Sequence, residues 1–241
     1  MIQSTNGIVL SYTAFSETSV IARIYTLQQG MQSYMIQGIR KPRARFSMNL
    51  LQPLTLVEFI AHNKESRQVQ RITEIKHDII FRSIPYDIVK TSIVFFLAEV
   101  ISKCNAEEES NEPLFNFIRS SLIQFDASDK PCVEFHFWFL IQLTKYLGFF
   151  PEAQKNKTYE YFDLREGIFR ADIPPYIEFV SGSNALFIDQ LARCSFEDHL
   201  QLNRPAAERQ EFIDVILLYF KLHALHGGKI NSLSVLQEVL H

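Results

Sequence analysis

The chain has 241 residues, a formal net charge of −3 and 47% hydrophobic residues. This length suffices for one large domain or two small ones, and no apolar run reaches the roughly 18 residues that a membrane-spanning helix needs. Cys104, Cys132 and Cys194 are far apart and form no Cys-x-x-Cys pair. This pattern argues against a disulfide framework or a thiolate zinc site and favours a reducing cytoplasm, and residues 1–7 do not resemble a signal peptide.

Short runs rich in β-branched residues dominate the first eighty residues. They predict five strands, over 7–12, 19–26, 31–38, 54–60 and 68–75. Gly30 supplies a turn after the second strand, and Pro53 opens the fourth, where its missing N–H costs least. Five short strands in so short a segment fit a small closed or nearly closed barrel.

Helical periodicity replaces this pattern after Pro85. Helices are predicted over 86–103, 113–125, 132–147, 184–193 and 205–225, with a last one starting at Asn231 or Ser232. The 132–147 helix is apolar nearly all round, so we expect it at the centre of this half, and 160–170 predicts a short hairpin. We therefore predict an α+β fold with a β-barrel domain at 1–80 and a mostly helical domain at 81–241.

A basic segment stands out in this acidic chain, because the residues from Thr18 to Val57 contain no Asp or Glu. They carry five cations, namely Arg23, Arg40, Lys41, Arg43 and Arg45. Residues 1–80 have a net charge of +4 and residues 81–241 a net charge of −7. Clustered cations neutralise phosphates and release counterions, so the run at 40–45 is a candidate nucleic-acid contact. The alternative is a solvated loop whose charge only maintains solubility.

Aromatic residues flank the basic run on the predicted strands. Tyr25 and Tyr34, and Phe46 directly after Arg45, are candidates for stacking on bases. Further cations extend the patch in principle but alternate with Glu65 and Glu74, which favours an ordinary solvated strand; they are Lys64, Arg67, Arg71 and Lys76.

No arrangement of residues in the sequence predicts catalysis. The phosphate-binding, dinucleotide-binding and nucleophile-elbow motifs are absent, and the seven histidines include no His-x-x-x-His pair. His223 and His226 share a helix face, where a favourable interaction with the helix dipole is a better explanation than metal binding. We expect a protein that is not an enzyme.

Several ordered pieces of the chain resemble the bacterial recombination mediator family RecO. Each piece alone is unspecific, but their order and spacing together are specific. They are Gly7-Ile8-Val9-Leu10, Gly38-Ile39-Arg40-Lys41 with Leu51-Gln52-Pro53, Tyr146-Leu147-Gly148-Phe149-Phe150-Pro151, Phe162-Asp163-Leu164-Arg165-Glu166-Gly167 and Ser232-Leu233-Ser234-Val235-Leu236.

The resemblance implies an N-terminal OB-fold, a helical C-terminal domain and no enzymatic activity. It implies binding to single- and double-stranded DNA, annealing of complementary strands, and partnership with RecR and with the acidic tail of the single-stranded DNA-binding protein SSB. Together these activities help to load recombinase onto SSB-coated DNA at the nucleoid. Arg40 and Lys41 match the family motif itself, whereas Arg43, Arg45 and Arg23 rest on charge and location.

The chain departs from the family in one respect, because many members carry a four-cysteine zinc site and residues 151–194 here contain one cysteine. We therefore expect no zinc and no other cofactor, with apolar packing in its place by Tyr159, Tyr161, Phe162, Leu164, Ile168 and Phe169. An alternative function is an adaptor that binds the SSB tail through the helical domain. Arg193, Arg204 and Arg209 are candidate donors to that tail, although ordinary surface charge is the preferred interpretation.

Overall fold

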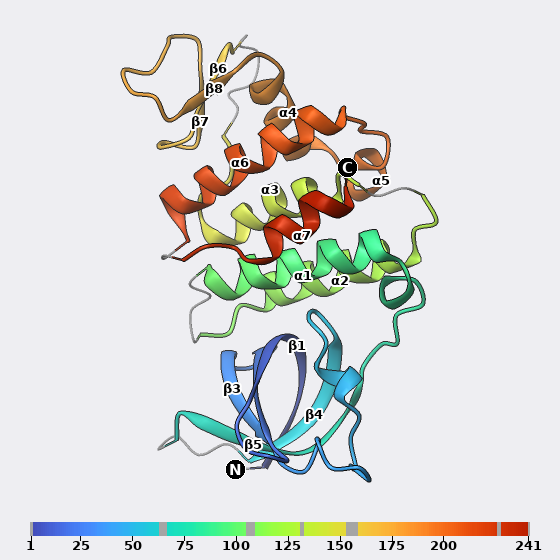
Figure 1. Cartoon of the computed structure of the whole chain (residues 1–241). Coiled ribbons are helices and arrows are strands. Elements are labelled where there is room, and N and C mark those ends of the chain that lie inside the picture. The colour runs from blue at the N-terminus through green and yellow to red at the C-terminus, as the bar shows by residue number, and fades with distance from the viewer. Residues whose placement is uncertain are drawn as a thin grey trace.

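The computed structural model describes residues 2–62, 67–104, 109–130, 133–152, 159–225 and 228–240. A β-barrel forms one end of the molecule and a helical part forms the other, as Figure 1 shows with the barrel at the bottom. The predicted α+β class, with strands first and helices after, is confirmed.

Five strands close the barrel in the order β1-β2-β3-β5-β4, which is the order of an OB-fold. They are β1 (Ile2–Ala14), β2 (Val20–Thr26), β3 (Gly30–Ile36), β4 (Leu56–His62) and β5 (Val69–His77). The long β1 pairs with β4 through its first half and with β2 through its second, and it bends at a bulge between Val9 and Ser11. A Cβ atom at Gly7 would lie 2.5 Å from Cγ2 of Ile24, so this close approach requires glycine.

Where the barrel faces the helices, its strands are buried on both of their faces. Inward-facing side chains such as Val9, Ile24 and Phe59 form a core inside the barrel. Outward-facing Leu10 and Tyr25 belong to a second core that continues through the helices. The barrel and the helical part therefore share one apolar core, and the predicted division near residue 80 remains a prediction.

The second half contains helices and one small sheet. The helical elements of this half are η2 (Ile84–Tyr86), α1 (Ile88–Lys103), α2 (Glu112–Ala127), α3 (Phe135–Leu147), α4 (Gly182–Arg193), α5 (Phe196–His199), α6 (Ala206–His223) and α7 (Ser232–Val239), whereas the short η1 (Met48–Leu51) lies between β3 and β4 of the barrel. The sheet has the order β7-β6-β8 and consists of β6 (Tyr161–Asp163), β7 (Ile168–Arg170) and β8 (Phe179–Ser181). Among the described residues, no helix is long and apolar enough to cross a membrane.

All six predicted helices and the predicted hairpin are present. Helix α3 is the buried centre that its apolar sequence predicts, since Phe135, Phe139 and Leu140 are all inaccessible to solvent. The short α5 and β8 were not predicted, because four and three residues are too few to show a period.

The small sheet occupies the region where the family resemblance implied a zinc site. Phe162, Leu164 and Phe169 pack there as expected, whereas Ile168 is 36% exposed. The buried carboxylate of Asp163 accepts hydrogen bonds from Tyr176 and from two backbone N–H groups of the β6–β7 turn. Apolar packing and one buried carboxylate thus hold this sheet together.

A polar cluster fixes the segment between barrel and helices, residues 78–87, against the end of α2. The Asp126 carboxylate accepts the backbone N–H groups of Arg82, Ser83 and Ile84 at 2.7, 2.8 and 2.9 Å. The buried Lys90 ammonium donates to the carbonyl oxygens of Phe125 and Ser128, at 2.9 and 2.7 Å, and to the Ser83 hydroxyl at 2.7 Å. Residues 78–87 are called the linker below.

Two buried histidines on the helical side are held in their neutral form. The imidazole of His199 stacks on Trp138, with ring centroids 5.1 Å apart, and neither of its nitrogens has a hydrogen-bond partner among the described residues. Burial lowers the pKa of His199 to about 4. Burial, with a smaller effect of the nearby Arg209 charge, lowers the pKa of His136 to about 3.

Replacement of Lys90 by Met should destabilise the fold by about 2 kcal/mol, because it leaves buried carbonyl oxygens without a donor. Urea unfolding followed by circular dichroism measures this change. The matched control is Lys145→Met on the exposed face of α3, which should change stability by less than about 0.5 kcal/mol. Equal stabilities of the two variants would contradict this role of Lys90.

Acid should destabilise the fold through the buried histidines. Below about pH 6.5 the unfolded chain binds a proton on each histidine that the folded chain does not bind, so stability falls as the pH falls toward the folded pKa. Between pH 7 and pH 5, His199 alone should contribute a loss of about 2 kcal/mol, which His199→Phe removes. Urea unfolding at both pH values tests this, with the exposed His62→Phe as control. A loss of stability between pH 7 and pH 5 that is as large in His199→Phe as in the wild type would refute it.

Candidate nucleic-acid interface

The basic run forms a loop that apolar residues anchor to the barrel. This basic loop, residues 38–47, connects β3 to η1 and begins at Gly38, whose φ of +74° favours glycine. Ile39 is 3% exposed and inserts into the barrel core, and the partly buried Phe46 packs against the same core. Beyond the loop, Leu51 of η1 is fully buried. Both ends of the basic loop are therefore fixed.

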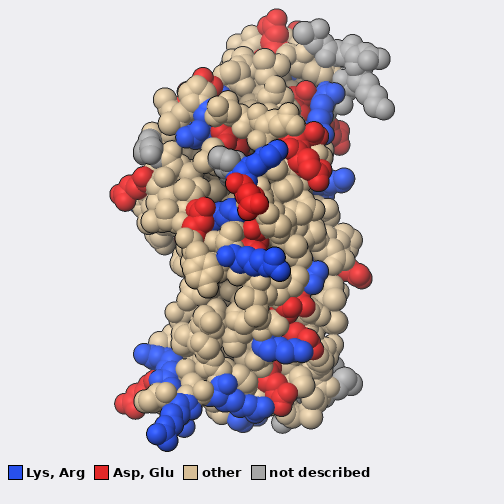
Figure 2. Space-filling view, turned by 90° about the vertical axis from the view of Figure 1, so that its right-hand side faces the viewer, with Lys and Arg blue, Asp and Glu red and all other residues tan. Residues whose placement is uncertain are grey.

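Three cations of the loop point outward and have no carboxylate partner among the described residues. Arg40 is held against the turn between β1 and β2, because its backbone N–H donates to the Thr18 carbonyl at 3.2 Å and its guanidinium to the Ser16 carbonyl at 3.0 Å. Lys41 and Arg43 are exposed, and no described residue forms an ion pair with them. Figure 2 shows Lys and Arg side chains gathered at the barrel end of the molecule.

Arg45 differs from its neighbours because it is paired with a carboxylate. Its guanidinium lies 3.1 Å from the Glu74 carboxylate of β5 and 5.2 Å from the centre of the Phe46 ring. Both charged side chains are more than half exposed, so the pair contributes little to stability. A phosphate can displace Glu74, but Arg45 presents less free charge than Lys41 or Arg43.

The other cations predicted near the loop are dispersed. Arg23 lies on the side of the barrel that faces the helices, with its guanidinium 3.4 Å from the Ser102 hydroxyl of α1. Lys76 forms an ion pair with Glu58 at 2.9 Å. Arg67 and Arg71 are exposed on or before β5, and Lys64 lies outside the described residues.

The structure does not support the predicted stacking role of two tyrosines. Tyr25 is 1% exposed and packs against Phe115 between barrel and helices, with its hydroxyl donating to the Asn111 carbonyl. Tyr34 is fully buried inside the barrel against Phe59. Burial raises the pKa of each tyrosine to about 12. Neither ring is accessible to a base, so Tyr25 and Tyr34 are no longer candidate DNA contacts.

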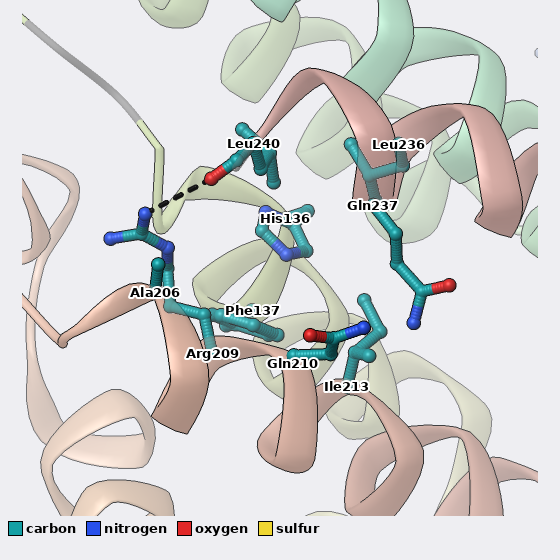
Figure 3. A pocket seen from close by; sticks show the side chains of 9 residues that line it. All are labelled: His136, Phe137, Ala206, Arg209, Gln210, Ile213, Leu236, Gln237 and Leu240. Carbon is teal, nitrogen blue, oxygen red and sulfur yellow. Dashed lines mark hydrogen bonds between the residues drawn. The ribbon is translucent and has the colours of Figure 1, made fainter.

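Ionisable groups gather at a second place, between α3, α6 and α7. His136 and Arg209 lie beside a small hollow (Figure 3), which has a volume of about 20 Å³. The Arg209 guanidinium donates to the Leu240 carbonyl at 3.2 Å. The Glu134 carboxylate, whose pKa is raised by burial, lies 3.5 Å from Arg209 and accepts the backbone N–H of Arg204 at 2.9 Å. A hollow of this size holds no more than a water molecule.

This second cluster stabilises the fold. The expectation that Arg204 and Arg209 are ordinary surface charges is therefore wrong. Arg204 is 6% exposed, and its guanidinium lies 4.5 and 4.9 Å from the ring centres of Phe187 and Phe212. Arg209 ties α6 to the start of α3 and the end of α7. Arg193 is exposed and pairs with Asp189 one helical turn away. In the part of the chain that the structure describes, no group of His, Cys, Asp and Glu is arranged to hold a metal.

Comparisons with known proteins cover both halves of the chain. Residues 1–78 match the family described as "Recombination protein O N terminal", and residues 85–233 match "Recombination protein O C terminal". Similar proteins named "DNA repair protein RecO" occur in Christiangramia forsetii, 33% identical over 240 residues, and in Azobacteroides pseudotrichonymphae, 32% identical over 239 residues. A relative of the same name in Bacteroides fragilis is 32% identical over 240 residues.

Each of these three alignments covers 99% of this chain and 99% of the relative. The motifs that carry the resemblance are therefore part of a likeness over the full length. RecO proteins act as DNA repair mediators and are not known as enzymes, in agreement with the absence of catalytic motifs. The chain belongs to the RecO family of DNA repair proteins.

Proposed function

We propose that this chain is a DNA-binding recombination mediator whose basic loop binds the phosphate backbone. In this proposal it binds single- and double-stranded DNA, anneals complementary strands and helps RecR to load recombinase onto SSB-coated single strands. The observation that carries the proposal is the outward position of Arg40, Lys41 and Arg43 on a loop anchored at both ends.

The charge distribution supports DNA contact at the barrel end. An anchored loop holds its cations apart before DNA arrives, so little conformational entropy is lost on binding. Residues 81–241 carry a net charge of −7, which disfavours a polyanion along the helical part. In this proposal Arg45 contacts DNA after its ion pair with Glu74 is broken, and Arg23 remains a candidate DNA contact because of its charge alone.

Family membership supports the proposed protein partners, RecR and the acidic tail of SSB. It also supports a place at the nucleoid in the cytoplasm, where these proteins and their DNA meet. The adaptor function, in which the helical domain binds the SSB tail and DNA contact is incidental, is the alternative that the following experiment separates.

Removal of the three free cations should weaken DNA binding on every sequence. The variant Arg40→Ala/Lys41→Ala/Arg43→Ala should lower the affinity for fluorescein-labelled oligothymidine. The slope of log K against log salt should lose about 2 units, because each lost phosphate contact contributes about 0.7 on single strands. Fluorescence anisotropy titrations at several salt concentrations measure both quantities.

The matched control removes three exposed cations from the helical part, Lys145→Ala/Arg193→Ala/Lys221→Ala, and so changes the net charge equally. This control should bind nearly as the wild type does. An equal loss in both triple variants would refute a local role for the basic loop. A wild-type chain that fails to bind oligothymidine at low salt but binds a labelled acidic tail peptide would establish the adaptor instead.

A further inference from the structure

An uncharged groove begins where the basic loop ends. It has a volume of about 320 Å³ and lies between η1, the linker and the start of α1. Its walls include Asn49, Gln52, His77, Ile80, Tyr86 and Phe95, and among the residues that the structure describes no Asp, Glu, Lys or Arg side chain lines it. Figure 1 shows η1 and the linker on the right-hand side, and Figure 2 faces that side, with uncharged surface above the cations of the barrel end.

Large apolar side chains on this groove are unusually exposed. Tyr86 is 86% exposed, Ile80 75% and Phe95 43%. Single exposed apolar residues are common on protein surfaces, but several on one groove are typical of a binding site. The ring of Tyr86 is presented by the short η2 turn, in which its N–H donates to the Ser83 carbonyl at 3.0 Å.

The platform under Tyr86 is rigid, because the Asp126 carboxylate holds the linker backbone at Arg82, Ser83 and Ile84. Pro85 adds a fixed φ angle directly before the aromatic residue. A planar ligand that stacks on Tyr86 therefore orders little of the protein, which favours binding.

The polar groups of the groove can both donate and accept hydrogen bonds without carrying charge. No described residue hydrogen-bonds to the side-chain amides of Asn49 and Gln52. Burial lowers the pKa of His77, so its imidazole is neutral at pH 7, with one donor and one acceptor. Flat aromatic surface with neutral donors and acceptors matches the faces and edges of nucleobases.

The position of the groove directly after the basic loop indicates which kind of ligand it binds. Asn49 and Gln52 follow Lys41 and Arg43 in the same anchored segment, so the groove adjoins the segment that carries the proposed phosphate contacts. A second hollow of about 580 Å³ continues past Phe95 between barrel, α1 and α7, but it contains the ion pair of Glu99 and Lys103 and is left out of the site.

We infer that this groove receives unpaired bases of a single DNA strand whose phosphates lie on the basic loop, with Tyr86 and Phe95 as the stacking surfaces. The inference rests on the proposed function, since it takes the basic loop as the phosphate contact. It assigns the base-stacking role to residues outside the barrel, in place of Tyr25 and Tyr34.

Two probes separate base binding from phosphate binding in the full-length protein. They are a fluorescein-labelled oligothymidine and an abasic strand of the same length, which has the same phosphates and no bases. Tyr86→Ala should lower the affinity for oligothymidine roughly five- to hundredfold, as loss of one stacking contact does, with an unchanged salt slope. The abasic strand should bind Tyr86→Ala and the wild type equally.

Tyr86→Phe keeps the aromatic face and should bind oligothymidine as the wild type does. Leu186→Ala, which removes a side chain 61% exposed on α4, controls for loss of exposed apolar surface and should have no effect. Urea unfolding should show that all variants are folded, because each changed side chain is largely exposed.

Wild-type affinity of Tyr86→Ala for oligothymidine would overturn the inference, and so would an equal loss on both probes. Either result leaves the proposed function intact as long as the triple variant of the basic loop still binds weakly. Failure of the wild type to bind either strand would instead contradict the proposed function. A labelled apolar peptide that loses affinity on Tyr86→Ala but is not displaced by oligothymidine would identify the groove as a protein-docking site and overturn the inference.

Discussion

Apolar side chains on the outer face of the barrel pack directly on the helices and form one core with them. Leu10, Tyr25 and Leu56 come from the barrel, and Val94 and Phe115 come from α1 and α2. Burial of this kind stabilises a protein by about 25 cal/mol per Å² of apolar surface, so separating the two parts would be costly. The basic loop of the barrel and the groove between η1, the linker and α1 thereby keep a fixed relative position.

Hydrogen bonds at the two ends of α1 hold the neighbouring segments in place. At the start of the helix, Lys90 and Asp126 hold the linker. Near its end, the Glu99 carboxylate accepts the hydroxyl and the N–H of Ser232 at 2.6 and 2.8 Å and so fixes the start of α7. Burial alone raises the pKa of Glu99, but the hydrogen bonds from Ser232, Lys103 and the Asn231 backbone outweigh it and lower the pKa to about 2. Each end of α1 thus carries a hydrogen-bonded charge that positions a neighbouring segment, buried at Lys90 and partly buried at Glu99.

Local pattern was sufficient to predict the longer elements and the position of the basic loop, but not which surfaces are covered. The alternation along β2 places Ile24 and Tyr25 on opposite faces, and only the packing of α2 decides that the Tyr25 face is buried as well. Arg204 was expected at the surface because charged residues usually are, and its burial depends on Phe187 and Phe212 from two other helices. Tyr86 lay within a predicted helix, and nothing in the sequence shows that its ring faces solvent.

In the proposed arrangement the phosphates and the bases of a strand bind at two different places, which has a consequence for strand annealing. In the proposed function, phosphate contacts on the basic loop leave the base edges free, since they depend only on the backbone. A groove that holds one or two bases contributes about 1–3 kcal/mol for each, whereas each base-pair step of a duplex contributes about 1.4 kcal/mol. A few new base pairs with a complementary strand therefore suffice to withdraw the bases from the groove. A short stacking surface next to an anchored basic loop is compatible with annealing, whereas a long aromatic channel would oppose it.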